Sequence, residues 1–399
     1  MRSSAMKFMG STKSVVLTVA AIALALNFGL GLVMGLSDPL EGDAYYYYQL
    51  ADSLSEGNGY VVRDGFWPED PSMRRMPGWP FIASVAMRLM PFAPEAGVMR
   101  WLCLLLNAAS PVLVALLALR LFRNNAIGLL SGLASAVHPS GLLAAQEGLS
   151  EPAFVTLTAA GALLLMNGLC AFRASCSSGS MRPSGRAWAA ALFGFLLLGL
   201  ACLVRANFVL WIGFFGLAAG CFALRQRSVP MLALLAIGAL LFVTPPLLWA
   251  VRNHGICGHF PVFSALRGQT FYGGNNDIVA NDKTYWGYWI FPNQIPGETP
   301  MVTLAQSMSE YDVDVYYNDR GKAWIAAHKG DMPTLLLGKL VRAYVPISWS
   351  RSLPSYAMNG FRAIYIGLAA LGFLLMRRKV DRGYVEIMAG MILTSFVTV

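Results

Sequence analysis

Long apolar stretches that carry almost no charge alternate along this chain with polar connections. A transmembrane helix needs about 20 such residues, because each residue advances a helix by about 1.5 Å across a hydrocarbon core of about 30 Å. The first stretch follows the basic segment MRSSAMKFMGSTK and is too long for a signal peptide, so we expect an uncleaved first span. The pattern predicts spans at 14–36, 97–121, 126–145, 152–172, 187–204, 207–224, 230–251, 356–376 and 384–399.

Two long polar segments, 37–96 and 252–355, interrupt this pattern. The first contains a short apolar stretch, 79–92, which is too short to cross a bilayer and predicts a helix lying at the membrane interface. Three regions follow from the pattern. Residues 1–251 form a transmembrane core with the first outer loop, 252–355 form an outer-face subdomain, and 356–399 form C-terminal transmembrane helices.

The last region stops inside apolar sequence, which fits either a truncated chain or an end within the membrane.

Earlier in the chain, His138 and Pro139 interrupt the predicted span 126–145. We expect His138 to be a hydrogen-bonded core residue or the partner of a proline kink, because a lone histidine among apolar residues makes a poor metal site.

Composition agrees with an all-α polytopic membrane protein. Hydrophobic residues make up 56% of the 399 residues and charged residues 13%, and the mean hydropathy is +0.54, whereas soluble domains are about one quarter charged. The net charge is +9, but no basic stripe carries aromatic residues suited to stacking bases, so the expected partner is the lipid bilayer and not nucleic acid. The six cysteines show no spacing typical of a metal site.

Lysine and arginine gather in alternate connections between the predicted spans. Such residues mark the cytoplasmic side of a membrane protein. The N-terminus is therefore expected in the cytoplasm, and both long polar segments on the outer face of an inner (plasma) membrane. The residues concerned are Arg2, Lys7, Lys13, Arg120, Arg123, Arg173, Arg182, Arg186, Arg225, Arg227, Arg377, Arg378, Lys379 and Arg382.

Acids and arginines collect where the predicted spans end on the outer side. A carboxylate there can act as a general base toward a hydroxyl. Arginines at the same depth can bind the oxygens of a lipid-linked phosphate. Together they indicate transfer of a group from a polyprenyl phosphate. The residues at these ends include Glu41, Asp43, Arg74, Arg75, Glu147, Glu151, Arg205, Asn207, Arg252, Asn253 and His254.

Each of these residues also has a plainer explanation. Juxtamembrane arginines commonly anchor helices by extending to the interface, and Glu151 can be a helix N-terminal charge that the macrodipole favours. The tyrosines at 45–48 can form an interfacial aromatic belt, with substrate contact as the alternative. The joint arrangement on one face of the membrane is what favours a site.

The sequence also resembles a known superfamily. The segments EGDAYYYYQLADSL, RMPGWPFI, LSEPAF and PPLLWAVRNHGICGHFPVFSALRGQTFYGGNND resemble the GT-C glycosyltransferases, in particular the branch of protein O-mannosyltransferases and bacterial aminoarabinose transferases. The resemblance implies a bundle of about nine or more transmembrane helices with two large outer-face loops that carry juxtamembrane helices. It also implies transfer of a sugar from a polyprenyl-phosphate donor to an acceptor hydroxyl or phosphate, with inversion at the anomeric carbon.

The resemblance extends to individual residues. Asp43 matches the first-loop acid that these enzymes use for catalysis, and Glu151 matches a second acid. Basic residues near the donor phosphate correspond to Arg75, Arg205 and Arg252. The candidates for substrate binding are Glu41, Tyr46, Asn253 and Asn275.

The chain departs from the family pattern at two places. Several relatives have a glutamate directly after the first-loop aspartate, where this chain has Ala44, and His328 precedes Lys329 where proline is common. The identity of the second first-loop acid is therefore open, and His328 receives no role. Members of the superfamily differ in metal dependence, so a divalent ion held by Asp43 and Glu151 stays open, although no ligand spacing supports it.

Two other classes of function fit a polytopic protein. A transporter or flippase would place ionisable residues near the middle of the membrane along a pathway, whereas the acids here lie at predicted helix ends. A non-catalytic assembly protein would use the outer loops to recognise a partner. The sequence fixes neither the sugar nor the acceptor nor the length of the polyprenol.

Overall fold

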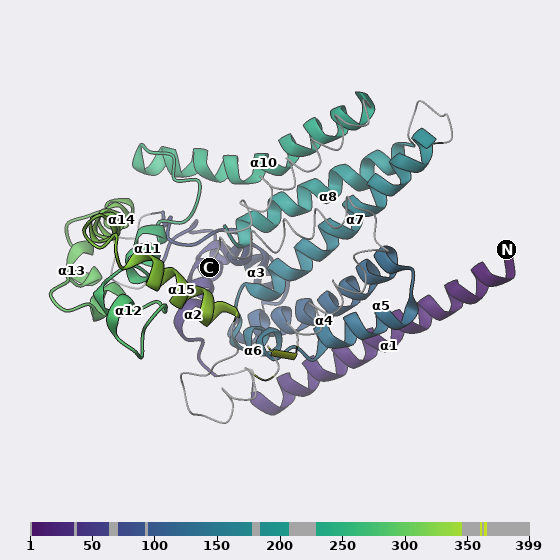
Figure 1. The fold of residues 1–399 in the computed structure, drawn as a ribbon, viewed down its shortest axis with the longest axis horizontal. Coiled ribbons are helices and arrows are strands. Elements are labelled where there is room, and N and C mark those ends of the chain that lie inside the picture. The colour runs from purple at the N-terminus through teal and green to yellow at the C-terminus, as the bar shows by residue number, and fades with distance from the viewer. Residues whose placement is uncertain are drawn as a thin grey trace. The chain divides into compact units, whose positions relative to one another are not determined.

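The chain is described by a computed structural model, and every regular element among the residues it describes is a helix (Figure 1), as predicted. It divides into two compact units, one formed by Met1–Val61 with Met76–Arg252, the other by Val62–Arg75 with the chain from Asn253 onward. The division of the chain into residues 1–251, 252–355 and 356–399 remains a prediction from the sequence. The structure describes residues 2–35, 38–63, 71–91, 95–177, 184–206, 229–344, 360 and 363–364.

Within the described residues, five helices are long and apolar enough to cross a membrane. They agree with the predicted spans 14–36, 97–121, 152–172, 187–204 and 230–251, so the chain is a multi-pass membrane protein. The predicted spans 207–224 and 384–399, and all of 356–376 except residues 360 and 363–364, lie outside the described residues. The five helices are α1 (Arg2–Met34), α4 (Glu95–Phe122), α7 (Glu151–Ser177), α8 (Gly185–Val204) and α10 (Val229–Cys257).

The predicted span at 126–145 is broken in its middle, and its two parts together are long and apolar enough to form one bent span. The segment forms two helices, α5 (Asn125–Ala136) and α6 (Pro139–Glu147), that are bent by 45° at the break between them. Pro139 has no backbone N–H and disfavours a helical conformation at the preceding residue, and His138 is accordingly extended, with φ −68° and ψ 114°. His138 thus lies at the kink beside Pro139.

The helices of the first unit have two distinct ends (Figure 1). The start of α1, the α4–α5 corner and the start of α10 lie at one end, where Thr12 Oγ1 donates to Asn125 Oδ1 at 3.3 Å. The end of α1, the end of α8 and the α6–α7 corner lie at the other. Asp43 and Glu151 are at this second end, whereas Arg120 and Arg123 are at the first.

A polar contact joins two of the spans in their interior. Asn107 Nδ2 donates to Asn27 Oδ1 at 2.9 Å, and Asn27 Nδ2 donates to Ala23 O at 2.8 Å. Asn27 is buried. A hydrogen bond of this kind between membrane helices contributes about 0.6–2 kcal/mol, so the pair holds α1 and α4 in one register.

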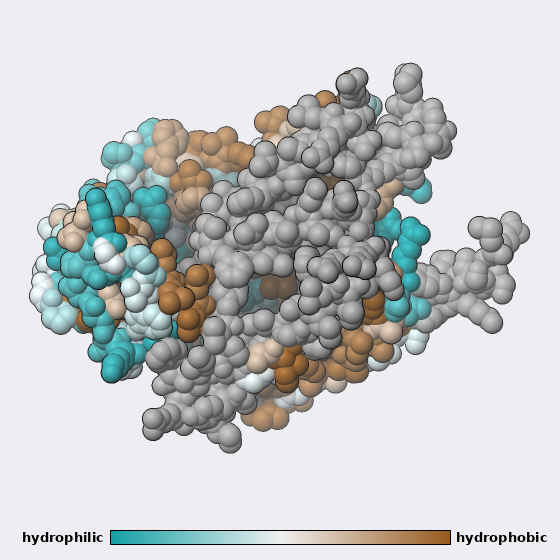
Figure 2. Space-filling view, viewed as in Figure 1, coloured by the Kyte–Doolittle hydropathy of each residue, from teal (hydrophilic) through white to brown (hydrophobic). Residues whose placement is uncertain are grey.

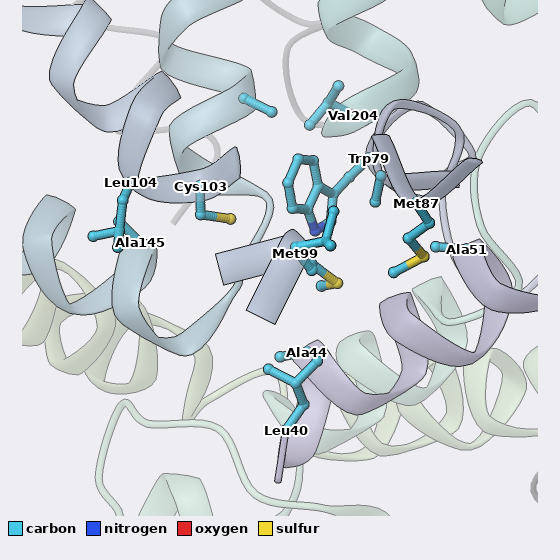
Figure 3. Packing of buried hydrophobic residues seen from close by; sticks show 13 residues of the cluster. Leu40, Ala44, Ala51, Trp79, Met87, Met99, Cys103, Leu104, Ala145 and Val204 are labelled. Carbon is cyan, nitrogen blue, oxygen red and sulfur yellow. The ribbon is translucent and has the colours of Figure 1, made fainter. Parts of the chain in front are cut away.

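Helix α3 (Gly78–Leu89) packs against the end of the bundle that carries the acids. A Cβ on Gly78 would lie 2.8 Å from the Leu203 carbonyl group, so only glycine permits this approach to the end of α8. The next residue, Trp79, is fully buried, and its Nε1 donates to Gly148 O at 3.1 Å. Figure 3 shows its indole ring between Val204 and Met99. Trp79 thereby fixes α3 to the α6–α7 corner.

The opposite face of α3 is apolar and exposed. Phe81, Val85 and Leu89 follow one another at intervals of four residues, with exposed fractions of 61%, 44% and 74%. A helix of 12 residues is too short to cross a bilayer. The interfacial placement predicted for 79–92 therefore remains a prediction, and this face is the one that would contact lipid.

The second unit is built from short helices, and the face of it seen in Figure 2 carries many polar residues beside some apolar ones. Part of the first loop belongs to it, because Glu310 accepts hydrogen bonds from Ser72 Oγ at 2.9 Å and from the Met73 N–H at 2.5 Å. The helices are α11 (Arg267–Gly273), α12 (Asp277–Asn281), the 3₁₀ helix η1 (Pro292–Gln294), α13 (Met301–Ala305), α14 (Glu310–Ala327) and α15 (Met332–Tyr344).

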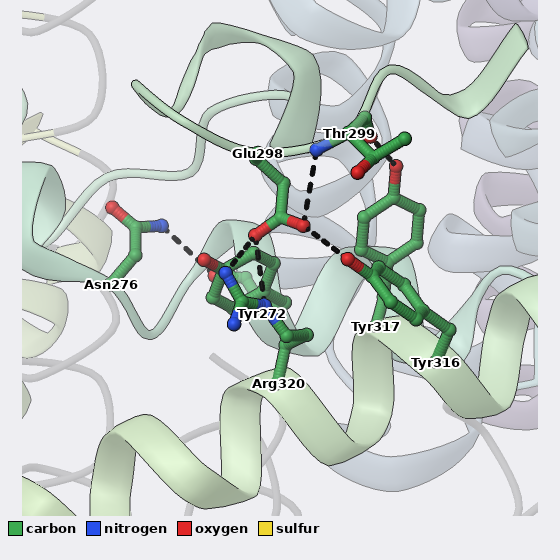
Figure 4. A network of polar contacts seen from close by, with 7 residues as sticks. All are labelled: Tyr272, Asn276, Glu298, Thr299, Tyr316, Tyr317 and Arg320. Carbon is green, nitrogen blue, oxygen red and sulfur yellow. Dashed lines mark hydrogen bonds and ion pairs between the residues drawn. The ribbon is translucent and has the colours of Figure 1, made fainter. Parts of the chain in front are cut away.

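A buried carboxylate organises this unit (Figure 4). Glu298 accepts hydrogen bonds from the Tyr316 hydroxyl at 2.7 Å and from Arg320 Nε and Nη2 at 3.0 and 2.7 Å. The Tyr317 hydroxyl donates to Thr299 O at 3.1 Å. The contacts tie α14 to the loop before α13, so the second unit depends on a satisfied polar network as well as on apolar burial.

The charge of Glu298 is favoured in the folded chain. Burial alone would raise the pKa of this carboxyl group, but the hydrogen bonds from Tyr316, Arg320 and Tyr272 outweigh burial and leave the pKa below its ordinary value. A carboxyl group whose pKa is lowered by folding stabilises the folded state above its ordinary pKa, about 4.3 for glutamate, and loses this contribution as the pH falls.

We therefore expect Glu298→Gln to destabilise the second unit at neutral pH by about 2 kcal/mol, because hydrogen bonds to a charged group become bonds to a neutral amide. The wild-type unfolding temperature should fall more steeply than that of the variant as the pH falls from about 5 to about 3. Thermal unfolding in detergent followed by tryptophan fluorescence measures both. Asp319→Asn is the matched control, since its pair with Lys322 is exposed, and equal effects of the two changes would contradict the assignment.

The interfacial placement of α3 can be measured with a fluorescent residue on each face. We expect Phe81→Trp, in a background without other exposed tryptophans, to be quenched by lipids brominated near the headgroup, because Phe81 lies on the exposed apolar face. Tyr311→Trp, in the second unit, serves as the comparison. A Phe81→Trp side chain that is quenched by aqueous iodide and not by brominated lipid would refute the placement.

Candidate functional site

The first acidic segment enters helix α2 (Gly42–Glu56) through a turn at Gly42. Glu41 is the N-cap residue, and Gly42 has φ +56°, a left-handed conformation that glycine adopts at little cost. Asp43 follows in the first turn of the helix, where the positive end of the helix dipole favours a carboxylate. Glu41 and Asp43 are both exposed, so the turn presents them outward.

The second acidic segment is the corner between α6 and α7. Gly148 ends α6 with φ +82°, and a Cβ at this position would lie 3.3 Å from Leu40 Cδ2. Ser150 Oγ lies 3.5 Å from the Tyr47 hydroxyl. The corner therefore packs beside the first acidic segment and places Glu151 in the first turn of α7.

A cavity of about 520 Å³ lies between these two segments. One arginine and three carboxylates face it, so its charge favours a ligand with hydroxyl groups that can donate hydrogen bonds. The predicted residues Asp43 and Glu41 both belong to it. The lining residues are Pro39, Glu41, Gly42, Asp43, Arg100, Glu147 and Leu149.

Arg100 is the cavity residue that sequence reasoning missed. It lies in the first two turns of α4, inside the predicted span 97–121, and is only 6% exposed. An arginine within an apolar span is costly unless polar groups surround it. That cost is a signal in the sequence, and it could have marked Arg100 as a residue with partners at the end of the bundle.

The structure pairs two of the predicted site residues with each other. Arg205 Nη1 lies 2.5 Å from Glu151 Oε1, and the two side chains are 37% and 41% exposed. An ion pair this exposed contributes only about 0.2–1 kcal/mol. Glu151 and Arg205 are therefore brought together, but each would have to leave the other before contacting a substrate through the same atoms.

Arg252 has a different environment at the end of α10. Its guanidinium carbon lies 4.5 Å from the centre of the Trp249 ring and 5.5 Å from the centre of the Tyr60 ring. Arginine stacks on aromatic faces through the face of its guanidinium plane and binds phosphate through the edge of that plane. The stack thus fixes the orientation of the plane.

The four tyrosines of α2 divide between two environments. Tyr47 and Tyr48 pack against the apolar core that contains Trp79. Tyr45 is 39% exposed, and its ring centre lies 6.1 Å from that of the half-buried Tyr46. The division follows helical periodicity, so Tyr46 keeps an accessible surface for the contact predicted for it.

Three of the predicted site residues belong to the second unit. Arg75 is half-buried. Asn253 is fully buried, and its Nδ2 donates to Pro261 O at 3.1 Å. Asn275 is 5% exposed, donates to Phe271 O at 2.7 Å and accepts from Lys339 Nζ at 3.1 Å. The amide groups of Asn253 and Asn275 thus hold the fold locally. Donor-phosphate binding by Arg75 and substrate binding by Asn253 and Asn275 remain predictions.

The described side chains do not fit a divalent metal. Among them, no three His, Cys, Asp or Glu residues converge in a way that could hold an ion, and the carboxylate of Glu151 is engaged by Arg205. Divalent cations in proteins usually take several oxygen ligands. No step through a metal is therefore assigned to Asp43 and Glu151.

The similarity of this chain to known proteins is a similarity to solved structures. No protein-family profile and no curated protein sequence matches the chain. The archaeal oligosaccharyltransferase AglB from Archaeoglobus fulgidus, solved with an inhibitory peptide and a dolichol-phosphate, is similar with a TM-score of 0.47 and 14% identity over 96% of this chain and 38% of that chain.

A second structure, the Archaeoglobus fulgidus oligosaccharyltransferase tethered to an acceptor peptide by a disulfide bond, has a TM-score of 0.42 and 12% identity. That match covers 93% of this chain and 38% of the other. This chain therefore spans well under half the length of both proteins, and neither likeness assigns it an activity.

Proposed function

We propose that this chain is a GT-C-type glycosyltransferase of the inner membrane. It transfers a sugar from a polyprenyl-phosphate donor to an acceptor hydroxyl or phosphate on the outer face, with inversion. The observation that carries the proposal is the acidic cavity at one end of the apolar bundle, with Asp43 on its wall. The resemblance of the first loop to that of this superfamily supports it.

Asp43 is the base in this proposal. Its carboxylate takes the proton of an acceptor hydroxyl while the hydroxyl oxygen attacks the anomeric carbon of the donor sugar. The bond between the anomeric carbon and the phosphate oxygen breaks, and the polyprenyl phosphate leaves with the bonding electrons. Attack from the side opposite the leaving group inverts the anomeric centre, and in this proposal Glu41, Tyr46 and Glu147 contact sugar hydroxyls.

Arginines of the first unit stabilise the departing phosphate. Arg252 lies near the end of α10, and Arg205 is the C-cap residue of α8. Guanidinium groups bind phosphate oxygens through two parallel hydrogen bonds, and they stabilise charge that develops in the transition state. A phosphate that binds Arg205 replaces Glu151 as its anionic partner, which releases the carboxylate of Glu151 toward the reaction.

The assignment of Asp43 is tested by Asp43→Asn. Loss of the base should lower transfer by about 10²–10⁴-fold, while expression and membrane insertion are unchanged because Asp43 is exposed. The assay uses the full chain in nanodiscs, a panel of radiolabelled undecaprenyl- and dolichyl-phosphate hexoses and pentoses, and bacterial membranes as acceptor. Asp52→Asn, two turns along α2 and outside the cavity lining, is the control. Full activity of Asp43→Asn would refute the role of base.

If the donor phosphate replaces Glu151 as the partner of Arg205, Glu151→Gln should have opposite effects on donor binding and on turnover. Glu151→Gln should lower the donor KM by about threefold, because a pair worth under about 1 kcal/mol no longer competes with phosphate. The same change should lower kcat. Arg205→Gln should raise the donor KM, and it is the matched variant from the other side of the pair. A donor KM that rises in Glu151→Gln would contradict competition between carboxylate and phosphate.

A further inference from the structure

Arg100 holds the two acidic segments of the cavity at the same time. Its Nε donates to Gln146 O at 3.0 Å and its Nη2 to Pro39 O at 3.2 Å, and its Nη1 donates to Asp38 O. All three acceptors are backbone carbonyls. The side chain is almost completely buried, so these bonds are made where their energy is not reduced by competing water.

The three carbonyls belong to the chain just before each acid. Asp38 and Pro39 lie five and four residues before Asp43, in the segment that leads into α2. Gln146 directly precedes Glu147 at the end of α6. One guanidinium group therefore connects the backbone that carries Asp43 to the backbone that carries Glu147, across a separation of more than 100 residues in sequence.

The side chain of Gln146 makes a further hydrogen bond close to these segments. Gln146 Nε2 donates to Gly35 O at 3.1 Å, so the end of α6 also holds the chain where it leaves α1. The acidic segment at 38–43 has no regular structure of its own before Gly42. Its position is thus set by the bonds from Arg100 and by the packing of the buried Leu40, while Gln146 holds Gly35 just before it.

The geometry is specific to arginine. A guanidinium group offers five N–H donors in a rigid plane, whereas a lysine ammonium is a compact charge on a flexible stem. Backbone carbonyls are neutral acceptors, so three of the donors of Arg100 serve the fold while its positive charge faces a cavity lined by Glu41, Asp43 and Glu147.

We propose that Arg100 is the positioning residue of the site, which sets the placement of Asp43 relative to the Glu147–Glu151 corner through the backbone and does not bind the donor phosphate. The expected effect of Arg100 on catalysis rests on the proposed function of Asp43 as the base. The effect of Arg100 on the distance between the two segments is independent of that function, because it concerns only the structure of the first unit.

The placement is tested without substrate. Spin labels at Tyr45→Cys on α2 and Val155→Cys on α7, both exposed positions outside the cavity lining, report the distance between the two segments in a cysteine-free chain in nanodiscs. Arg100→Lys should shift and broaden the distance distribution. Arg88→Lys is the control, because Arg88 also donates to two backbone carbonyls, Leu54 O and Ser55 O, but at the far end of α2. Unchanged distributions in Arg100→Lys would overturn the proposal.

Gln146→Leu provides a second variant if Arg100→Lys does not insert. It removes the bond to Gly35 O and leaves the bonds of Arg100 in place. We expect a change of the distance distribution in the same direction as for Arg100→Lys, but smaller. A distribution identical to that of the wild type would overturn the idea that these side-chain bonds set the position of residues 38–43.

Kinetics separate positioning from phosphate binding. Arg100→Lys should lower kcat by about 10²-fold, the cost of misplacing a catalytic group by about 1 Å, and leave the donor KM within about twofold of the wild-type value. A donor KM raised by about tenfold with unchanged kcat would identify Arg100 as a phosphate ligand and overturn the proposal. Absence of transfer by the wild-type chain would instead refute the proposed function, and the distance measurement would still decide the placement.

Discussion

Ionised side chains are costly in hydrocarbon, and this cost determines where the first unit can carry chemistry. Its spans bind one another through small residues and through neutral pairs such as Asn27 with Asn107. Carboxylates and guanidinium groups are placed where the apolar helices end, most of them exposed, as Asp43 is, or half-exposed, as Glu151 and Arg205 are. Arg100 shows the constraint most directly, since it enters an apolar helix only because three backbone carbonyls accept its hydrogen bonds.

The same constraint explains what could be predicted from the sequence. Helical spans follow from apolar length alone, so five of them agree with the structure, and acids at the ends of spans stand out against apolar surroundings, as Asp43 and Glu151 do. The break between α5 and α6 was visible only as the pair His138–Pro139. Apolar composition continues through that break, so hydropathy predicts one helix where the backbone forms two.

The partners of the site residues could not be predicted in this way. A bond from Arg100 to a carbonyl leaves no mark in the sequence, because every residue has a carbonyl. The pair of Glu151 with Arg205 depends on where α7 and α8 end in space. Asn253 and Asn275 look like binding residues beside glycines and aromatic residues, yet their amides satisfy local polar groups. Burial decides between these roles, and burial is a property of the tertiary structure.

The bond between Met73 and Glu310 has a consequence for how the chain is made. The two residues are 237 positions apart, and both belong to the second unit. Residues 71–75 are synthesised long before their partners, and most of the apolar helices of the first unit follow them. Contacts this distant in sequence form slowly, because a large loop must close first. The second unit can therefore be completed only after much of the membrane bundle has been inserted, and the early segment must stay soluble on its own until then.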